Sequence, residues 1–169
     1  MTSPEKVPTF LPSSMDFAEY GQVIGIPDPK KKKPDFESEL IRFYGALGVF
    51  DSKVPVEFGI CVYKKRELVI EQLEQHLGTQ ELLYAIDDDF IVAAATNAAH
   101  GSTNVPDLNK LIGVRIRRGE GVLFHRETWH SVPYSRDKES FALVCFAKGT
   151  AKDDMHIFKL DGKPRMEAR

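Results

Sequence analysis

The chain has 169 residues, of which 42% are hydrophobic and 28% are charged, and its formal net charge is −2. A chain of this length is expected to form one domain that buries roughly 70% of the surface of the unfolded chain. No apolar stretch approaches the roughly 20 residues that a membrane-spanning helix needs. The charge argues against a general nucleic-acid binder, because such proteins usually carry a strongly positive patch. We therefore expect a globular protein with no membrane and no nucleic-acid partner.

The N-terminal stretch Met1–Met15 contains three prolines and no continuous apolar segment. It matches neither a secretory signal nor an amphipathic transit peptide, which predicts a cytoplasmic location. For the domain organisation we expect a flexible N-terminal segment at residues 1–16, a single domain over residues 17–160, and a flexible tail at residues 161–169.

The first predicted element is a short helix or turn over Pro12–Tyr20, capped by a serine at its start and followed by Gly21. The proline-rich segment Pro27–Pro34 then interrupts any regular pattern. It contains the one basic run of the chain, Lys30–Lys33, which is flanked by prolines and aspartates and is interpreted as a solvated loop.

Beyond the proline-rich segment the chain consists mainly of short runs rich in Val, Ile, Phe and Tyr, separated by Gly, Asp, Asn and Pro. Such runs predict β-strands. They are Leu40–Tyr44, Val56–Tyr63, Leu68–His76, Glu81–Ile86, Phe90–Ala95, Gly113–Arg117, Gly121–Phe124 and Ser140–Lys148. One further short turn is predicted at Val105–Leu111. The spacing favours an all-β fold, either a sandwich or a barrel of antiparallel strands.

Both cysteines, Cys61 and Cys145, lie inside apolar runs. This placement predicts two small buried hydrophobic side chains. A structural disulfide is not expected in a chain without export signals.

The first candidate cluster lies in the segment Leu73–Glu81. Glu74 and His76 are two positions apart on a predicted strand and therefore point to the same face. After a turn, Gln80 or Glu81 begins the next strand and can return a polar group to the same place. Spacing alone leaves open a rim pair without any ion.

The second cluster is Gly121–His130, which contains two histidines in a protein that has only five. His130 follows a turn, and His125 lies on the near side of that turn. Together with the first cluster they offer imidazole and carboxylate ligands suited to Zn, Mn, Ni or Fe. Two plainer interpretations stay open: Arg126 could neutralise a neighbouring glutamate, and Trp129 could be a packing residue.

These residues carry a resemblance to a known family. The pattern Glu74-x-His76-(x)4-Glu81, followed by Trp129-His130, resembles the two metal motifs of a cupin, with Glu74 in place of the usual first histidine. Several short sequence segments are more closely similar to the ureidoglycolate lyase family, and they occur in the order found in that family, from about residue 17 to about residue 150. They are Phe17-Ala-Glu-Tyr20-Gly21, Leu73-Glu-Gln-His76-Leu-Gly78-Thr79-Gln80, Pro106-Asp107-Leu108, Gly121-Val122, His125-Arg126 and Trp129-His130.

The resemblance implies a cupin-type antiparallel β-barrel of the double-stranded β-helix or jelly-roll kind, with a few short peripheral helices. It also implies an enzyme of purine and allantoin nitrogen catabolism that splits ureidoglycolate into glyoxylate and urea. That substrate is a hemiaminal, so loss of its hydroxyl proton and protonation of the departing nitrogen release urea. Families of this type pair through exposed strands, and open strand edges invite such pairing, so a homodimer is expected.

The resemblance further implies roles for individual residues. One divalent transition ion, Ni, Mn or Zn, would be held by Glu74, His76, Glu81 and His130, although a metal-free polar pocket is also possible. The substrate carboxylate calls for the paired donors of an arginine. Among the residues that do not bind the ion, His125 is expected to act as general acid or base and Lys148 as a catalytic residue. Arg126 is expected to bind the substrate and to take part in catalysis. Gln80 and Trp129 are expected to bind the substrate.

The chain departs from the family pattern in three places. The turn after His76 is one residue shorter, Lys148 stands alone where the family has an Asp-Arg-Gly-Gly-like sequence, and Arg42-Phe43-Tyr44 replaces an early family histidine. These departures keep a second function open: a cupin with diverged chemistry, or a non-catalytic binding protein for a small carboxylate ligand.

Overall fold

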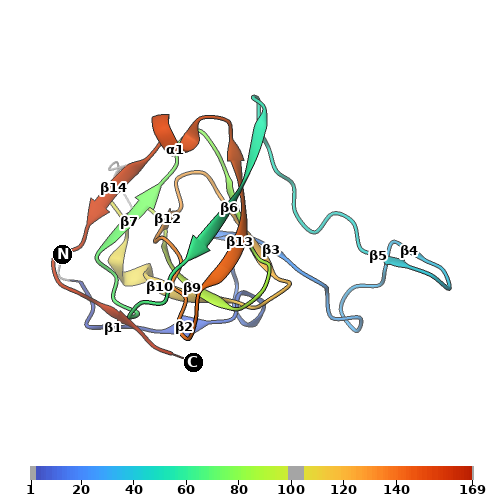
Figure 1. The fold of residues 1–169 in the computed structure, drawn as a ribbon, viewed down its shortest axis with the longest axis horizontal. Helices are drawn as coiled ribbons and strands as arrows, with labels where there is room; N and C mark the ends of the chain where they lie inside the picture. Colours follow the sequence, from blue (N-terminus) through green and yellow to red (C-terminus); the bar gives the residue numbers. More distant parts are fainter. Residues whose placement is uncertain (1–2, 99–104, 169) are drawn as a thin grey trace.

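The computed structural model describes residues 3–98 and 105–168, and within them the fold is all-β (Figure 1). In these two ranges short strands follow one another, with only single turns of helix between them. The elements are β1 (Lys6–Val7), β2 (Thr9–Phe10), η1 (Pro12–Ser14), β3 (Gly21–Ile24), β4 (Phe36–Glu37), β5 (Arg42–Phe43), β6 (Val56–Tyr63), β7 (Gln72–Gln75), β8 (Glu81–Ala85), β9 (Phe90–Ala95), η2 (Leu108–Lys110), β10 (Ile112–Ile116), β11 (Gly121–Phe124), β12 (Trp129–His130), β13 (Ser140–Ala147), α1 (Thr150–Asp153), β14 (His156–Lys159) and β15 (Arg165–Met166).

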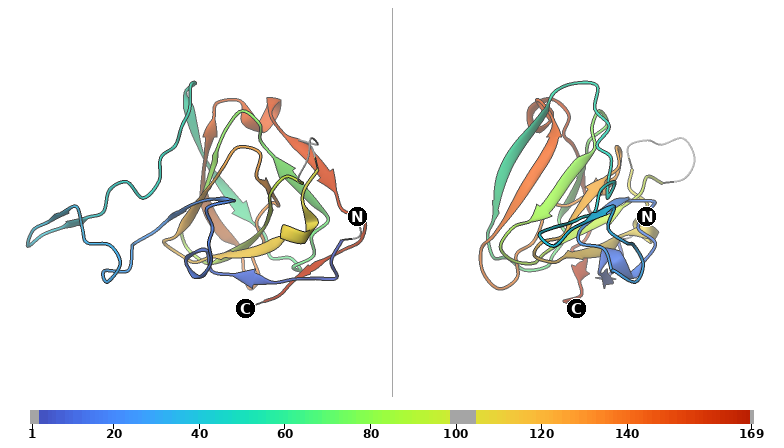
Figure 2. Two further views of the ribbon diagram at one scale, coloured as in Figure 1. Left: turned by 180° about the vertical axis from the view of Figure 1, so that it is seen from behind. Right: turned by 90° about the vertical axis from the view of Figure 1, so that its right-hand side faces the viewer.

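Two large sheets face each other. One has six strands in the order β14-β7-β12-β9-β10-β2, and the other has five in the order β3-β11-β8-β13-β6. Both sheets contribute apolar side chains to one shared core, among them Val92 and Val114 from the first and Leu83, Val122 and Val144 from the second. Figure 2 shows the two sheets enclosing this interior from two directions. The expected all-β fold is confirmed, although no strand pairing within residues 3–98 and 105–168 closes the sheets into a continuous barrel.

A second apolar cluster covers the outer face of the six-stranded sheet. Strand β9 serves both clusters, because Val92 points into the shared interior while its neighbours Ile91 and Ala93 point outward. This alternation is the period of two that a strand imposes. The two terminal segments pack over this outer cluster. Strand β1 pairs with β15, and β2 pairs with β10. Strands therefore occur in both terminal segments, whose flexibility stays a prediction.

Three of the predicted strands have the limits that the sequence indicates. The limits of β6, β9 and β11 are those expected from the sequence. The strand expected over Leu68–His76 is regular only as β7, and the element expected over Pro12–Tyr20 forms only the 3-10 turn η1. Gly21 begins β3 instead of following a helix. A glycine is needed there because β3 pairs with β11, and a Cβ at this position would approach the Leu123 carbonyl oxygen to 2.3 Å. Within the described ranges, no helix is long and apolar enough to cross a membrane.

The segment of residues 25–55, here called the arm, connects the two edge strands β3 and β6 of the five-stranded sheet. It projects from the body of the molecule and ends in the β4–β5 hairpin (Figure 1). The predicted strand Leu40–Tyr44 lies on this arm and is reduced to the two residues of β5. The basic run Lys30–Lys33 forms a turn on the same arm.

The expectation that both cysteines are buried was wrong for one of them. Cys145 is buried, but Cys61 is exposed, and both are free thiols. The reason is that Cys61 lies on β6, an edge strand with a neighbour on one side only.

Candidate metal centre

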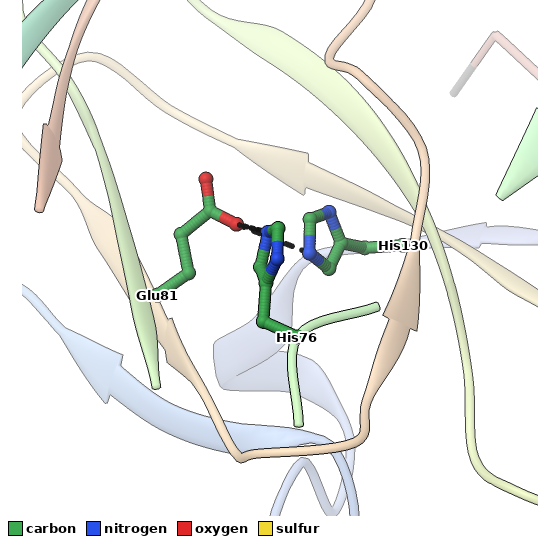
Figure 3. A group of neighbouring side chains, drawn as sticks. All are labelled: His76, Glu81 and His130. Atoms are coloured by element: carbon green, nitrogen blue, oxygen red, sulfur yellow. Dashed lines mark hydrogen bonds and ion pairs between the residues drawn. The ribbon is translucent and has the colours of Figure 1, made fainter. Parts of the chain in front are cut away.

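Three polar side chains converge between the two sheets: His76, Glu81 and His130 (Figure 3). One carboxylate oxygen, Glu81 Oε2, lies 3.0 Å from His76 Nε2 and 3.1 Å from His130 Nε2. All three candidate ligand atoms lie within 4.8 Å of one another. The residues are only 6%, 7% and 2% exposed, respectively. Such a buried polar group needs a chemical reason, because each unpaired buried polar atom costs about 1–3 kcal/mol.

The three side chains come from three strands. His76 directly follows β7, Glu81 begins β8, and His130 ends β12. The tight turn between β7 and β8 therefore brings the first two together locally. His130 arrives from a distant part of the chain because β12 pairs with β7, which places His130 opposite Glu74.

The imidazole of His76 is oriented through its other ring nitrogen. His76 Nδ1 lies 2.6 Å from the Asp154 carbonyl oxygen, an acceptor that requires a hydrogen on Nδ1. The Asp154 carboxylate also accepts hydrogen bonds from the backbone N–H groups of Leu77 and Gly78, at 3.0 and 2.8 Å. Asp154 thus holds both the ring and the turn that follows it. An orienting partner on the far ring nitrogen is typical of metal-binding histidines.

The second imidazole is held by stacking and by a nearby carboxylate. The His130 ring stacks on Phe124 with centroids 5.1 Å apart and planes 3° apart. Its Nδ1 lies 3.8 Å from Glu74 Oε1, beyond hydrogen-bond distance, and has no partner of its own. Glu74, which the sequence grouped with the metal ligands, therefore lies on the far side of the ring from Glu81.

The charges of the three groups are strongly coupled. Burial alone would raise the pKa of Glu81, but the adjacent His130 and His76 outweigh it and lower that pKa to about 2. Burial alone would lower the pKa of His76, but the hydrogen bond to Glu81 and its charge raise that pKa to about 9. Burial raises the pKa of Glu74. The Glu81 carboxylate is thus ionised and attracts positive charge to this point.

Two imidazole nitrogens and one carboxylate oxygen suit a divalent transition ion, which can supply that charge. The fit is supported by two features of the residues themselves: the Nε2 atoms converge on one oxygen, and His76 is fixed in the tautomer whose Nε2 can bind an ion. This donor set resembles those of open metal sites that leave coordination positions for substrate. Within residues 3–98 and 105–168, His76, Glu81 and His130 form the group of histidine and acidic side chains that could hold a metal ion.

Two other predicted site residues, Gln80 and Arg126, bind the arm. Gln80 Oε1 accepts a hydrogen bond of 2.7 Å from the backbone N–H of Asp51. Arg126 donates to the Asp51 carboxylate at 3.2 Å and to the Asp51 carbonyl oxygen. The carboxylate that pairs with Arg126 is thus that of a residue 75 positions away and not that of a nearby glutamate, and Arg126 Nε also donates to the Gly78 carbonyl oxygen at 3.4 Å.

The remaining predicted residues point elsewhere. His125 Nε2 lies 3.1 Å from the Ala18 carbonyl oxygen. Trp129 belongs to the outer cluster, where its indole N–H donates to Asn97 Oδ1 at 2.8 Å and its ring packs on Phe158. Because neighbours on a strand face opposite sides, Trp129 and His130 cannot share one pocket. Lys148 is exposed at the end of β13.

Three functional contacts have no local signal in the sequence. Asp154 contacts His76 from a position 78 residues away, Asp51 contacts Gln80 and Arg126 from the arm, and Phe124 stacks on His130 from the neighbouring strand β11. The sequence placed Phe124 in the predicted strand Gly121–Phe124 but did not indicate that it would stack on an imidazole. An acidic side chain near a turn, such as Asp154, is too common to be singled out.

The position of Glu74 predicts a measurable effect on metal affinity. Glu74→Gln should weaken binding of an added divalent ion by about 10- to 100-fold, because an outer carboxylate raises the basicity of the histidine it faces. Titration with Zn²⁺ or Ni²⁺ followed by calorimetry measures the effect. The matched control is Glu71→Gln, an exposed residue paired with Lys163 just before β7. Equal affinity in both variants would show that Glu74 does not orient His130.

A comparison with protein-family models matched the ureidoglycolate lyase family over residues 8–166. No individual curated protein matched the chain. The matched range contains every strand from β2 to β15, and with them all three residues of the centre. A match over nearly the whole chain confirms the resemblance seen in its motifs: the protein belongs to the ureidoglycolate lyase family, whose members are lyases of the all-β cupin type.

Proposed function

We propose that this protein is a carbon–nitrogen lyase that cleaves ureidoglycolate to glyoxylate and urea. The observation that carries the proposal is the buried convergence of His76, Glu81 and His130 in a chain that belongs to this family. In this proposal these three residues hold one divalent ion, Ni, Mn or Zn, and Glu74 acts on His130 from outside the ligand set. The partners are a small carboxylate substrate and a second copy of the chain.

The reaction converts a hemiaminal into an aldehyde. The substrate hydroxyl loses its proton, the carbon–oxygen double bond forms as the carbon–nitrogen bond breaks, and the departing nitrogen takes up a proton to leave as urea. A divalent ion, when bound, lowers the pKa of an oxygen that coordinates it. His76 and His130 supply neutral nitrogen donors, and Glu81 supplies the negative charge that offsets the ion. Asp154 keeps His76 in the required tautomer.

We assign the substrate carboxylate to Arg126 at the rim. Its guanidinium is partly exposed and already binds one carboxylate, that of Asp51. A substrate carboxylate can take the place of Asp51 on the same paired donors. His125 and Lys148 stay predicted catalytic residues, although neither has a contact that turns it toward the centre.

The second candidate function is a cupin that binds a small carboxylate ligand with different chemistry or none. The observation that favours it is the occupied guanidinium of Arg126, because a neutralised arginine offers less to a substrate. The exposed position of Lys148 also favours this second function, because a catalytic cation is expected beside the reacting atoms.

The test is a direct assay of urea and glyoxylate release from ureidoglycolate. The protein is first stripped with a chelator, and Mn²⁺, Ni²⁺ and Zn²⁺ are then added separately. We expect both products, in equal amounts, with at least one ion and little or none from the stripped protein. If the protein binds an ion but forms no product with any of the three, the lyase proposal fails and the binding function takes its place.

A further inference from the structure

The inner face of strand β6 is exposed, although this face of the sheet covers the core. Gly59 and Cys61 pair directly with Val144 and Ala142 of β13, and residues opposite each other on antiparallel strands point to the same face. Val144 and Ala142 belong to the interior core. Gly59 and Cys61 therefore face the interior, yet both are exposed. The space between the two sheets is thus open along β6.

The edge strand of the other sheet has the same property. Strand β14 pairs with β7 so that Ile157 lies opposite Glu74, and Ile157 therefore shares the face on which Glu74 meets His130. The neighbouring Phe158 faces the other way and packs on the outer cluster. Ile157 is nevertheless 50% exposed. Within residues 3–98 and 105–168, β6 and β14 end their sheets without pairing with each other, and they lie apart in Figure 1. We call the space between these two edges the opening.

The opening leads to the metal centre. On the β14 side it begins at Glu74, whose carboxylate lies 3.8 Å from the buried and unpartnered Nδ1 of His130. On the β6 side, Glu57 pairs with Phe146 of β13. The Phe146 ring lies with its centroid 6.5 Å from that of His76. The metal centre is therefore one strand away from the inner face of β6.

The carboxylates around the centre also act on the inner face of β6. Partial burial raises the pKa of the Cys61 thiol, and the negative charges of Glu81 and Glu74 raise it further. Burial and the same two carboxylates raise the pKa of Tyr63, the next residue on this face. Because salt screens charges that are more than about 10 Å apart in water, an effect of both carboxylates on both groups indicates that this face lies close to the centre.

A glycine occupies the middle of this face without a backbone reason. All eight residues of β6 pair with β13 in one continuous register, so Gly59 is not part of a β-bulge. Its φ is not positive. A Cβ at Gly59 would meet no atom within 4 Å, so no neighbour excludes a side chain there. A glycine inside a strand weakens the strand, and it often marks a place where a ligand comes close to the backbone.

We propose that the substrate reaches the metal centre through the opening, and that Gly59 keeps this passage wide enough for it. The inference rests on the proposed function for the identity of the substrate, a small ureido hydroxy acid. Any side chain at position 59 would project into the opening, because its Cβ would face the interior. Gly59 therefore determines which small carboxylates gain access and takes no part in the chemical step.

Substitution of Gly59 tests this role. Gly59→Phe should raise the KM for ureidoglycolate at least about 10-fold and leave kcat within about threefold, because the added bulk hinders entry and not the chemical step. Removal of Zn²⁺ from the loaded protein by a chromogenic chelator should slow by a similar factor. One matched control is Gly59→Ala, which adds a single methyl group. The other is Ile60→Phe, which adds bulk at an exposed position on the outer face of the same strand. Both controls should behave like the unmodified protein.

The stability of the variants separates a blocked passage from a damaged fold. Gly59→Phe should unfold at the same urea concentration as the unmodified protein or at a higher one, because strands favour aromatic residues over glycine. If circular dichroism shows that Gly59→Phe is not folded, Gly59→Val takes its place, with the same expected changes in KM and in Zn²⁺ removal. A folded variant with unchanged KM and unchanged Zn²⁺ removal would overturn the proposal. A fall in kcat alone would overturn it as well.

Reaction of the unmodified protein with a bulky maleimide gives a second test. Cys61 is exposed and Cys145 is buried, so mass spectrometry should find one label. The label should slow Zn²⁺ removal as Gly59→Phe does, whereas Cys61→Ser should be insensitive to the reagent. A Cys61 that does not react, or whose label leaves Zn²⁺ removal unchanged, would contradict an open inner face.

The Zn²⁺ measurements distinguish the passage from the lyase reaction. If no ion supports release of urea but Gly59→Phe slows Zn²⁺ removal, the lyase proposal fails and the passage stands. If urea is released but Gly59→Phe changes neither KM nor Zn²⁺ removal, the passage fails and the lyase proposal stands. A protein that binds no ion and releases no urea would overturn both.

Discussion

His130→Ala should abolish uptake of a divalent ion and lower the turnover of ureidoglycolate by roughly 1,000-fold or more. His130 supplies one of the two imidazole nitrogens that face Glu81, and a metal-bound substrate oxygen is worth several kcal/mol in the transition state. Metal content after dialysis, together with the urea-release assay, measures both effects.

The fold of this variant needs a separate check, because His130 is 2% exposed and stacks on Phe124. His130→Gln retains more of the side-chain volume and should lose metal and activity in the same way. The control is Glu71→Gln, which replaces an exposed residue paired with Lys163 outside the centre. Full metal content and activity in a folded His130→Ala protein would defeat the assignment of the centre.

The metal-free protein should lose stability at both ends of the pH range because of the same cluster. The pKa of Glu81 is lowered from 4.5 to about 2, so its contribution to stability is complete above about pH 4.5 and is lost as the pH falls toward 2. The pKa of His76 is raised from 6.5 to about 9, so its contribution is complete below about pH 6.5 and is lost as the pH rises toward 9. The cluster therefore stabilises the metal-free fold most between about pH 4.5 and 6.5.

Urea denaturation in the presence of a chelator, repeated from pH 3 to pH 9, measures this dependence. Glu81→Gln should flatten both limbs of the profile, because the raised pKa of His76 depends chiefly on the Glu81 carboxylate. Glu71→Gln, which replaces an exposed carboxylate, should keep the profile of the unmodified protein. If the Glu81→Gln profile follows that of the unmodified protein, the ion pairing around Glu81 does not contribute to stability.

Several features of the site follow from local sequence alone. His76 and Glu81 flank a turn of four residues between two predicted strands, and this short turn keeps them close although β7 and β8 lie in different sheets. The continuous apolar runs of β9 and β11, bounded by turn residues, determined both strands and their limits, because a short apolar run of this kind is typical of a strand buried on both faces. The motifs around Gly121–His130 placed the second imidazole in the same family pattern, and the match over residues 8–166 confirmed that family.

Which of several chemically similar or neighbouring side chains faces the centre depended on contacts between distant parts of the chain. Glu74 and Glu81 are both acidic and both adjacent to His76, yet only the Glu81 oxygen lies between the two Nε2 atoms. Trp129 and His130 are neighbours, but the pairing of β12 turns one to the outer cluster and the other to the centre. Arg126 binds an aspartate of the arm that no local pattern connects to it.

The sequence by itself determined that this protein is all-β, that it belongs to a lyase family, and that histidine and carboxylate side chains would meet at one point. Only the tertiary structure decided which carboxylate faces both imidazoles, that Asp154 orients His76, and that the inner face of β6 is exposed. The physical reason is that strand period and turn length act between near neighbours. Which strand lies at an edge, and which ring nitrogen meets which oxygen, is set by pairing between distant parts of the chain.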